Sequence, residues 1–227
     1  MIVEKLKLNC SLDKLLEGGI EAGIVTEIYG EGGTGKTNIC IQAAKSCVEN
    51  GKRVVYIDSE GVSKERLLQV FKDKKKLEKI LFFFPYSLKE QEEMVEKAIK
   101  IDAGLIILDS ANLFYRLEMD EDEAKATRSL TKQLVTLQIE ARKKNIPVII
   151  TNQVYHEFLS KEEFEAGKKA GTRMVGGDLL KYWSKCLIEL KVENGKRKAI
   201  LRKHRSLREK ELNFIITNKG IKKRGWI

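Results

Sequence analysis

Short apolar runs alternate with longer amphipathic stretches along the first two thirds of the chain. The apolar runs are rich in β-branched residues and fall at about 24–29, 53–58, 80–84, 104–109 and 147–152. The amphipathic stretches fall at about 36–49, 64–74, 88–100 and 122–145. Strands that alternate with helices in this way form a mostly parallel sheet with helices on both faces. The pattern therefore predicts an α/β fold.

The pattern changes after Thr151. Residues 156–173 are polar and contain glycine, and we interpret them as a long loop, a feature that is usually functional or disordered in a compact domain. Further strands are expected at about 184–192, 197–203 and 212–217. The first two are joined by Asn194-Gly195, a strong hairpin signal. We therefore expect antiparallel strands at the C-terminal end of a single domain that spans residues 1–227.

The positive charge gathers at the C-terminal end. The chain has 227 residues and a net charge of +10. From residue 181 onward it carries 15 Lys or Arg against 4 Glu, a net charge of +11, so the rest of the chain sums to −1. A basic end on a nearly neutral body favours a polyanionic partner, above all nucleic acid. The alternatives are a solubilising surface and the Lys and Glu enrichment that accompanies growth at high temperature.

Composition excludes several other classes. The four cysteines form no C-x-x-C pair and the chain has two histidines, so the spacing of a structural zinc site is absent and we expect reduced thiols. No apolar run approaches the roughly 20 residues of a membrane-spanning helix. The first residues lack the continuous apolar stretch of a signal peptide. We therefore expect a cytoplasmic protein with no membrane partner.

A glycine-rich segment lies between the first of these strands and the first long helix. It matches G-x-x-x-x-G-K-[ST] and consists of Gly30, Glu31, Gly32, Gly33, Thr34, Gly35, Lys36 and Thr37. The glycines let successive N–H groups point at phosphate oxygens, and the helix N-terminus adds partial positive charge. In such a loop Lys36 reaches the β- and γ-phosphates, and the Thr37 hydroxyl ligates Mg²⁺. The segment predicts a site for ATP and Mg²⁺.

Three polar residues at strand ends extend this prediction. Asp109 ends an apolar strand roughly 70 residues after the loop and is expected to hold Mg²⁺ through water. Glu60 follows the strand predicted over about 53–58 and is a candidate base for the attacking water, although a charge at a helix N-terminus is the alternative. Gln153 is a candidate sensor of the γ-phosphate, although an ordinary strand-end hydrogen bond is the alternative.

These segments together resemble the RecA/RadA recombinase superfamily, and within it the archaeal RadB family, over about residues 8 to 220. The resemblance rests on Ser11 to Leu16, Gly18-Gly19-Ile20, the glycine-rich loop, Tyr56 to Gly61 with Glu65-Arg66-Leu67, Asp109-Ser110-Ala111 with Leu113 to Arg116, Ile149 to Val154, Gly176-Gly177 and Lys203-His204-Arg205-Ser206. It implies a RecA-type ATPase core. It also implies that Glu60 is the general base, that Arg66 stacks on the adenine and that Gln153 senses the γ-phosphate. For Lys203 and Arg205 it leaves two roles open, contact with the nucleotide of a neighbouring subunit and contact with DNA phosphates.

Several departures from the recombinase pattern bear on function. We expect neither a separate N-terminal DNA-binding domain nor the short polymerisation segment that precedes the recombinase core. The region after Arg116, where recombinases carry their first DNA-binding loop, is acidic. Residues 156–173 mix glutamates with lysines, which is unusual for a segment that follows phosphates. These differences favour a paralogue that assists the main recombinase over an autonomous filament.

We therefore predict an accessory protein of DNA repair and homologous recombination. It is expected to bind ATP, Mg²⁺ and DNA, with single-stranded DNA preferred, and to have weak or DNA-modulated ATPase activity. Expected protein partners are the main archaeal recombinase or other recombination proteins, and a homodimer is compatible with this hypothesis. The alternatives are a KaiC-like regulatory ATPase without a DNA role and a strand-exchange recombinase.

Overall fold

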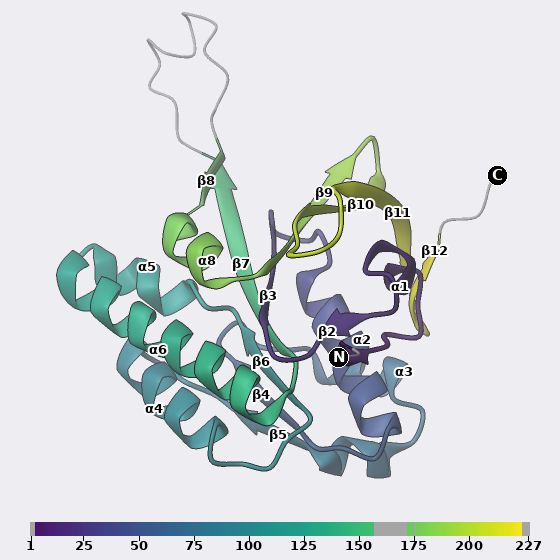
Figure 1. The fold of residues 1–227 in the computed structure, drawn as a ribbon, viewed down its shortest axis with the longest axis horizontal. Coiled ribbons are helices and arrows are strands. Elements are labelled where there is room, and N and C mark those ends of the chain that lie inside the picture. The colour runs from purple at the N-terminus through teal and green to yellow at the C-terminus, as the bar shows by residue number, and fades with distance from the viewer. Residues whose placement is uncertain (1–2, 157–171, 175, 224–227) are drawn as a thin grey trace, which may run out of the picture.

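A large twisted sheet forms the centre of the molecule (Figure 1). The computed structural model describes residues 3–156, 172–174 and 176–223. In that part of the chain the sheet runs in the order β5-β4-β6-β7-β3-β9-β10-β11-β12, and β8 pairs with β7. The parallel strands are β3 (Val25–Gly30), β4 (Val54–Asp58), β5 (Ile80–Phe83), β6 (Leu105–Asp109), β7 (Val148–His156) and β9 (Cys186–Glu193). The antiparallel strands are β8 (Thr172–Met174), β10 (Lys196–Lys203), β11 (Lys210–Thr217) and β12 (Gly220–Lys223).

Helices cover both faces of the parallel part. On one face lie α1 (Leu12–Leu15), α2 (Lys36–Glu49) and α3 (Lys64–Val70), with the 3₁₀ helix η1 (Lys74–Lys79). On the other lie α4 (Leu88–Ala98), α5 (Leu113–Met119), α6 (Glu123–Lys144) and α8 (Gly177–Trp183). The small hairpin of β1 (Lys5–Leu6) and β2 (Ile20–Glu21) precedes β3. Every residue of β4 and β6 is buried, as expected for strands covered on both faces. The predicted fold class is confirmed.

The main elements lie where the hydrophobic pattern placed them, with local differences. The predicted helix over 36–49 coincides with α2, but the one predicted over 64–74 ends at Val70. Phe71 adopts an extended conformation and turns into the core, where it is 2% exposed, so the helix stops. The sequence pattern did not predict several short elements, namely β1, α1, β2, η1, α5, β8, α8 and β12.

The loop predicted over 156–173 lies mostly outside the described residues. At its ends the structure shows strand instead, because β7 continues to His156 and pairs with β8. Apolar and polar residues do not alternate through this extension, so the sequence pattern did not predict it. It forms because its backbone hydrogen-bonds to β8. Within the described part of the chain, no helix has the length and apolar character needed to cross a bilayer.

Candidate nucleotide-binding site

The glycine-rich loop joins the end of β3 to the start of α2. Gly30, Gly33 and Gly35 have φ angles of 155°, 73° and 112°, which side chains other than glycine rarely adopt. At Gly30 a Cβ atom would lie 2.3 Å from the carbonyl oxygen of Leu190 on β9. Gly35 caps α2 in a left-handed conformation, so the free N–H groups of the first helical turn face the loop. This geometry suits the binding of an anion.

Lys36 is held inside this loop. Its side chain is buried, and its Nζ donates to the carbonyl oxygens of Gly30 at 2.9 Å and Glu31 at 3.0 Å. Among the described residues no carboxylate lies within ion-pair distance of it. Burial lowers the pKa of Lys36, and the charges of Glu60 and Asp109 oppose that shift. A buried ammonium group with only carbonyl partners gains most from a nearby anion, so the residue fits a phosphate ligand.

Asp109 lies behind the loop at the end of β6 and has no exposed surface. It accepts hydrogen bonds from the hydroxyl groups of Tyr56 at 2.6 Å and Thr151 at 2.5 Å, and its peptide bond to Ser110 is cis. Burial raises the pKa of the Asp109 carboxyl, while hydrogen bonds from Thr151, Tyr56 and Thr37 lower it. The contact with Thr37 brings together the two residues predicted to serve Mg²⁺.

The turn after β4 carries Glu60. Asp58 accepts the backbone N–H groups of Gly61 at 2.8 Å and Val62 at 2.7 Å, which fixes the turn. The Ser59 hydroxyl donates to the carbonyl oxygen of Ser110 at 2.8 Å and accepts from its N–H at 2.7 Å. These bonds tie the turn to the end of β6. Glu60 is exposed and lines the same cavity as the glycine-rich loop.

Gln153 reaches this cavity from β7. Its backbone is held by Asn112, which accepts from the Gln153 N–H at 3.2 Å and donates to its carbonyl oxygen at 3.0 Å. A Cβ atom at Gly32 would lie 3.5 Å from the Gln153 Nε2, so the amide stands beside the loop. An amide in this position can contact a terminal phosphate. Because Gln153 belongs to β7, such a contact would also act on that strand. The role of Gln153 as a sensor stays a prediction.

The cavity gathers most of the predicted site residues. It has a volume of about 510 Å³ and is lined by Gly32, Gly33, Gly35, Lys36, Thr37, Asn38, Glu60, Arg66, Gln153, Arg197 and Ile216. Its size, its loop of N–H groups and its cationic walls fit a nucleoside triphosphate. Among the described residues no cluster of three His, Cys, Asp or Glu could hold a metal. Mg²⁺ would therefore depend on Thr37, on Asp109 through water and on phosphate oxygens, which is common for this ion.

Two residues of the glycine-rich loop have a structural place within it. Thr34 is buried, and its hydroxyl donates to the carbonyl oxygen of Glu31 at 2.8 Å, which closes the loop. Glu31 is exposed and offers this carbonyl to Lys36 as well. Both residues shape the loop through its backbone.

Arg66 lines the cavity from α3, and two of its three guanidinium nitrogens are hydrogen-bonded, while Nη2 is buried without a partner. Its Nε donates to Asn38 Oδ1 at 2.6 Å, and its Nη1 donates to the carbonyl oxygen of Thr217 at 2.9 Å. Arg66 thus connects α2 to β11. Its predicted stacking on adenine remains a prediction.

Lys203 and Arg205 lie away from the cavity. Lys203 ends β10 and pairs with Leu187, near the start of β9, whereas the glycine-rich loop lies beyond the far end of β3. The Lys203 Nζ donates to the carbonyl oxygens of Lys181 at 2.8 Å and Ser184 at 3.0 Å, and Arg205 forms an ion pair with Glu21. The two residues therefore occupy the opposite edge of the sheet from the loop of their own chain. Both predicted roles stay open.

Sequence analysis missed several residues of the site. Tyr56 and Thr151 bind Asp109, Asn112 positions Gln153, Asn38 holds Arg66 and Arg197 lines the cavity. The first three lie inside recognised segments, where a polar residue in a buried strand or at its end was the available signal. Arg197 has no local signal, because only the sheet order brings β10 beside the glycine-rich loop.

Comparisons with known proteins agree with this architecture. The family model described as Rad51 matches residues 5–224. The DNA repair and recombination protein RadB of Methanococcoides burtonii is 40% identical over 231 residues, covering 97% of this chain and 99% of that protein. RadB of Thermoplasma acidophilum is 41% identical over 218 residues, covering 92% of this chain and 90% of that protein. A crystal structure of the RadB recombinase superposes with a TM-score of 0.79 and 32% identity, over 97% of this chain and 100% of that one.

Proposed function

Because the chain belongs to the Rad51 family and groups with its RadB members, we propose that it is an accessory protein of DNA repair and homologous recombination. In this proposal it binds ATP with Mg²⁺, hydrolyses ATP slowly and binds DNA, with single-stranded DNA preferred. Its protein partners are other recombination proteins, above all the main recombinase of the cell.

One observation carries the nucleotide half of the proposal. Lys36, Thr37, Glu60 and Gln153 come from three separate segments and line one cavity, with Asp109 directly behind it. If the glycine-rich loop served only as a turn, nothing would require an acid, an amide and a buried cation to lie together beside it.

The chain's own groups have distinct parts in this proposal. The bound nucleotide supplies a phosphoanhydride bond that water can cleave. Lys36 neutralises charge on the terminal phosphates, and Thr37 and Asp109 orient the metal. Glu60 takes a proton from the attacking water, and Gln153 contacts the terminal phosphate from β7. The carboxylate of Glu60 is suited to accept this proton because it lines the cavity and is accessible to a water molecule there.

The first test is ATP binding by Lys36→Ala. The variant removes a charge-assisted contact to phosphate, so we expect ATP affinity to fall by at least about tenfold in a calorimetric titration. Lys45→Ala is the matched control, since it removes a lysine from the same helix outside the cavity. Equal affinity of Lys36→Ala and the unsubstituted protein would refute the site.

One observation favours the second function, a regulatory ATPase without a DNA role. Part of the C-terminal positive charge is already paired with acidic residues. The basic residues in these ion pairs are Lys191, Lys198, Arg202, Arg205 and Lys210. Titration with single-stranded DNA at low salt separates the two functions, because the regulatory ATPase would give no complex.

A further inference from the structure

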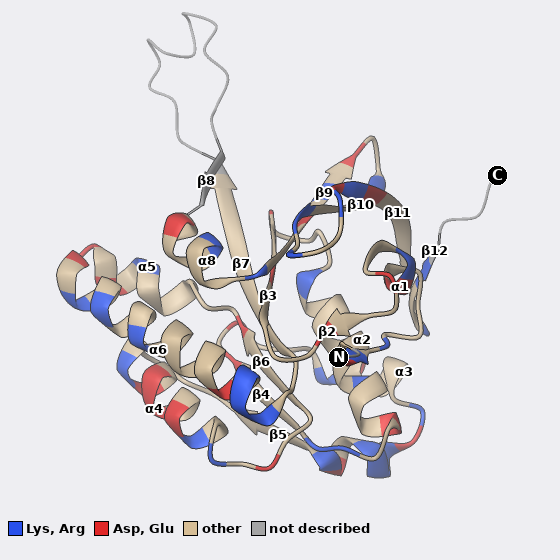
Figure 2. Cartoon of the chain, in the orientation of Figure 1, with Lys and Arg blue, Asp and Glu red and all other residues tan. Residues whose placement is uncertain are grey.

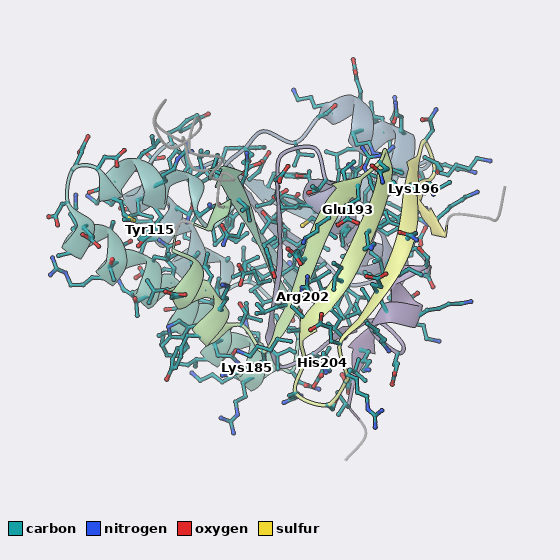
Figure 3. All side chains as sticks on the ribbon, turned by 90° about the horizontal axis from the view of Figure 1, so that it is seen from above. Tyr115, Lys185, Glu193, Lys196, Arg202 and His204 are labelled. Carbon is teal, nitrogen blue, oxygen red and sulfur yellow. The ribbon has the colours of Figure 1, made fainter. Side chains whose placement is uncertain are left out.

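Two strands of the C-terminal antiparallel part reach the glycine-rich loop. On β10 the side chains of Leu201 and Ala199 are buried in the core beside α2. Side chains alternate along a strand, so Arg197 is next in the same row and lies at the end of β10 nearest the loop. Figure 3 shows the hairpin end, marked by Glu193 and Lys196, opposite the end marked by His204.

The neighbouring strand β11 packs against the same loop. Phe214 is the register partner of Arg197, and Ile216 follows it in the row that faces α2. A Cβ atom at Gly35 would lie 2.8 Å from the Ile216 Cδ1. Arg197 is therefore presented to the cavity by a strand whose position is fixed by close packing.

The guanidinium group of Arg197 has unused donors at the cavity. Its Nη2 donates to the carbonyl oxygen of Gly33 at 3.4 Å, a long and weak hydrogen bond. Its Nε is buried and has no hydrogen-bond partner. Within the described chain no acidic residue forms an ion pair with Arg197. A guanidinium group offers five N–H donors, so most of its capacity is available to a ligand.

The other two cations of the cavity are held more firmly than Arg197. Lys36 is bound to two carbonyl oxygens of the loop, and Arg66 is bound through its Nε and Nη1 to Asn38, Gln69 and Thr217, although its Nη2 is buried without a partner. Glu60 is the acidic residue in the lining, so the walls carry an excess of positive charge. An arginine with free donors beside a loop of N–H groups matches the oxygen atoms of a phosphate chain.

We propose that Arg197 is a phosphate-binding residue that acts on the nucleotide of its own subunit. The inference rests on the proposed function, since it concerns the same cavity. Arg197 contacts the phosphate chain of the triphosphate next to Gly33. It thereby makes the C-terminal antiparallel strands part of the nucleotide site.

The test compares Arg197→Ala and Arg197→Lys with Lys196→Ala. Lys196 is an adjacent exposed cation whose side chain faces the other side of β10, so its variant removes the same charge without touching the cavity. Affinities for ATP and for inorganic tripolyphosphate are measured by competition against a fluorescent ATP analogue. Thermal unfolding midpoints are measured with and without ATP.

We expect Arg197→Ala to weaken both ligands by about tenfold or more and Arg197→Lys to recover part of the loss. Lys196→Ala should stay within about twofold of the unsubstituted protein. The rise in unfolding midpoint on adding ATP should shrink for Arg197→Ala, while the midpoint without ATP stays unchanged.

Two results would overturn the inference while the proposed function stands. In the first, Arg197→Ala binds both ligands as the unsubstituted protein does, although Lys36→Ala does not. In the second, Arg197→Ala lowers the midpoint equally with and without ATP, which indicates a purely structural contact with Gly33. If Arg197→Ala does not fold, Arg197→Lys decides, because unchanged affinity together with a lowered midpoint without ATP rejects the inference. A failure of the unsubstituted protein to bind ATP would instead reject the proposed function.

Discussion

Two glutamates of the core lie in contrasting environments. Glu27, on β3, has no exposed surface, and one carboxylate oxygen accepts from the Asn152 amide at 3.0 Å while the other has no partner. Burial raises the pKa of Glu27 to about 7, and Asn152, Lys181 and Lys203 oppose this only in part. Glu60 is exposed at the cavity, so its carboxylate is accessible to solvent. The buried residue thus carries a cost when ionised, whereas the exposed one is available for chemistry.

Replacement of Glu27 by Gln should make stability less dependent on pH. The folded-state pKa of about 7 lies above the ordinary value of 4.5, so ionisation of Glu27 costs stability progressively as pH rises between these values. At pH 8 we expect Glu27→Gln to be more stable by up to about 3 kcal/mol, and near pH 4.5 to match the unsubstituted protein. Urea unfolding at both pH values measures this. Glu78→Gln, at an exposed site of η1 without an ion pair to another described residue, should shift neither midpoint, and equal stability of Glu27→Gln and the unsubstituted protein at pH 8 would contradict the prediction.

Replacement of Glu60 by Gln should separate binding from hydrolysis. Glutamine keeps the shape of the side chain but cannot take a proton from water. We expect single-turnover hydrolysis to slow by about 100-fold or more while ATP affinity changes little. Glu65→Gln is the control, because it removes an exposed carboxylate from the first turn of α3 outside the cavity. A normal hydrolysis rate in Glu60→Gln would assign Glu60 to the alternative role of a helix N-terminal charge.

At the scale of elements, the glycine-rich loop depends on how closely β3 and β9 approach. The strands pair in parallel up to Gly30 and Leu190, and the loop begins at this last pair. The space left there is too small for a side chain, since the obstacle is backbone and cannot rotate away. Gly30 therefore allows β3 and β9 to pair closely as well as allowing the loop to form the nucleotide site.

Gly30→Ala and Gly33→Ala should consequently differ. Both residues have positive φ angles, but nothing lies within 4 Å of a Cβ atom at Gly33. We expect Gly33→Ala to cost about 1 kcal/mol of stability from backbone strain alone and Gly30→Ala to cost at least about 2 kcal/mol more. Guanidinium unfolding of the two variants provides the comparison. Similar losses for both would show that the contact with Leu190 is relieved by a shift of β9.

Helices differ in whether the local sequence pattern is sufficient to predict them. Helix α2 lies where it was predicted because its start is marked by the glycine-rich loop and its buried face is continuous. Helices α5 and α8 are short, and both pack against α6; Gly176, which caps α8, also comes so close to α5 that a Cβ atom there would lie 2.9 Å from the Tyr115 ring. Short helices of this kind form through tertiary packing more than through propensity.

At the scale of the whole molecule, Lys and Arg recur along the C-terminal strands, and some acidic residues lie among them (Figure 2). On the strands β9 to β11, Lys198 lies 3.3 Å from both Glu193 and Glu211, and Arg202 lies 2.7 Å from Glu189. Lys185 and His204 lie at the end of these strands that is opposite Glu193 and Lys196 (Figure 3). Arg208 is exposed and lies in the turn that follows β10. Because Lys185 and Arg208 form no ion pair with another described residue, these two side chains are the better candidates for contact with a polyanion.

Affinity for single-stranded DNA should fall steeply with salt. Each phosphate neutralised contributes a slope of about −0.7 in a plot of log affinity against log salt concentration. We expect the variant Lys185→Ala/Arg208→Ala to reduce the slope by about 1.4, the contribution of two contacts. Arg142→Ala/Lys143→Ala, at the end of α6, is the control and should leave it unchanged. Fluorescence anisotropy at several salt concentrations measures both, and a flat response would argue against a DNA surface here.

The sequence by itself determined the α/β class, the glycine-rich loop and the places of Asp109 and Glu60 at the ends of their strands, because each depends on neighbours along the chain. Gln153 was expected at a strand end as well, but β7 continues beyond it to His156. The sequence did not place Lys203 and Arg205 relative to the cavity, nor bring Arg197 to Gly33. Those positions follow from the order β7-β3-β9-β10, which sets β3 beside strands from the other end of the chain. The tertiary structure decided them because contacts between distant segments arise from packing of the whole sheet, and no local spacing encodes that packing.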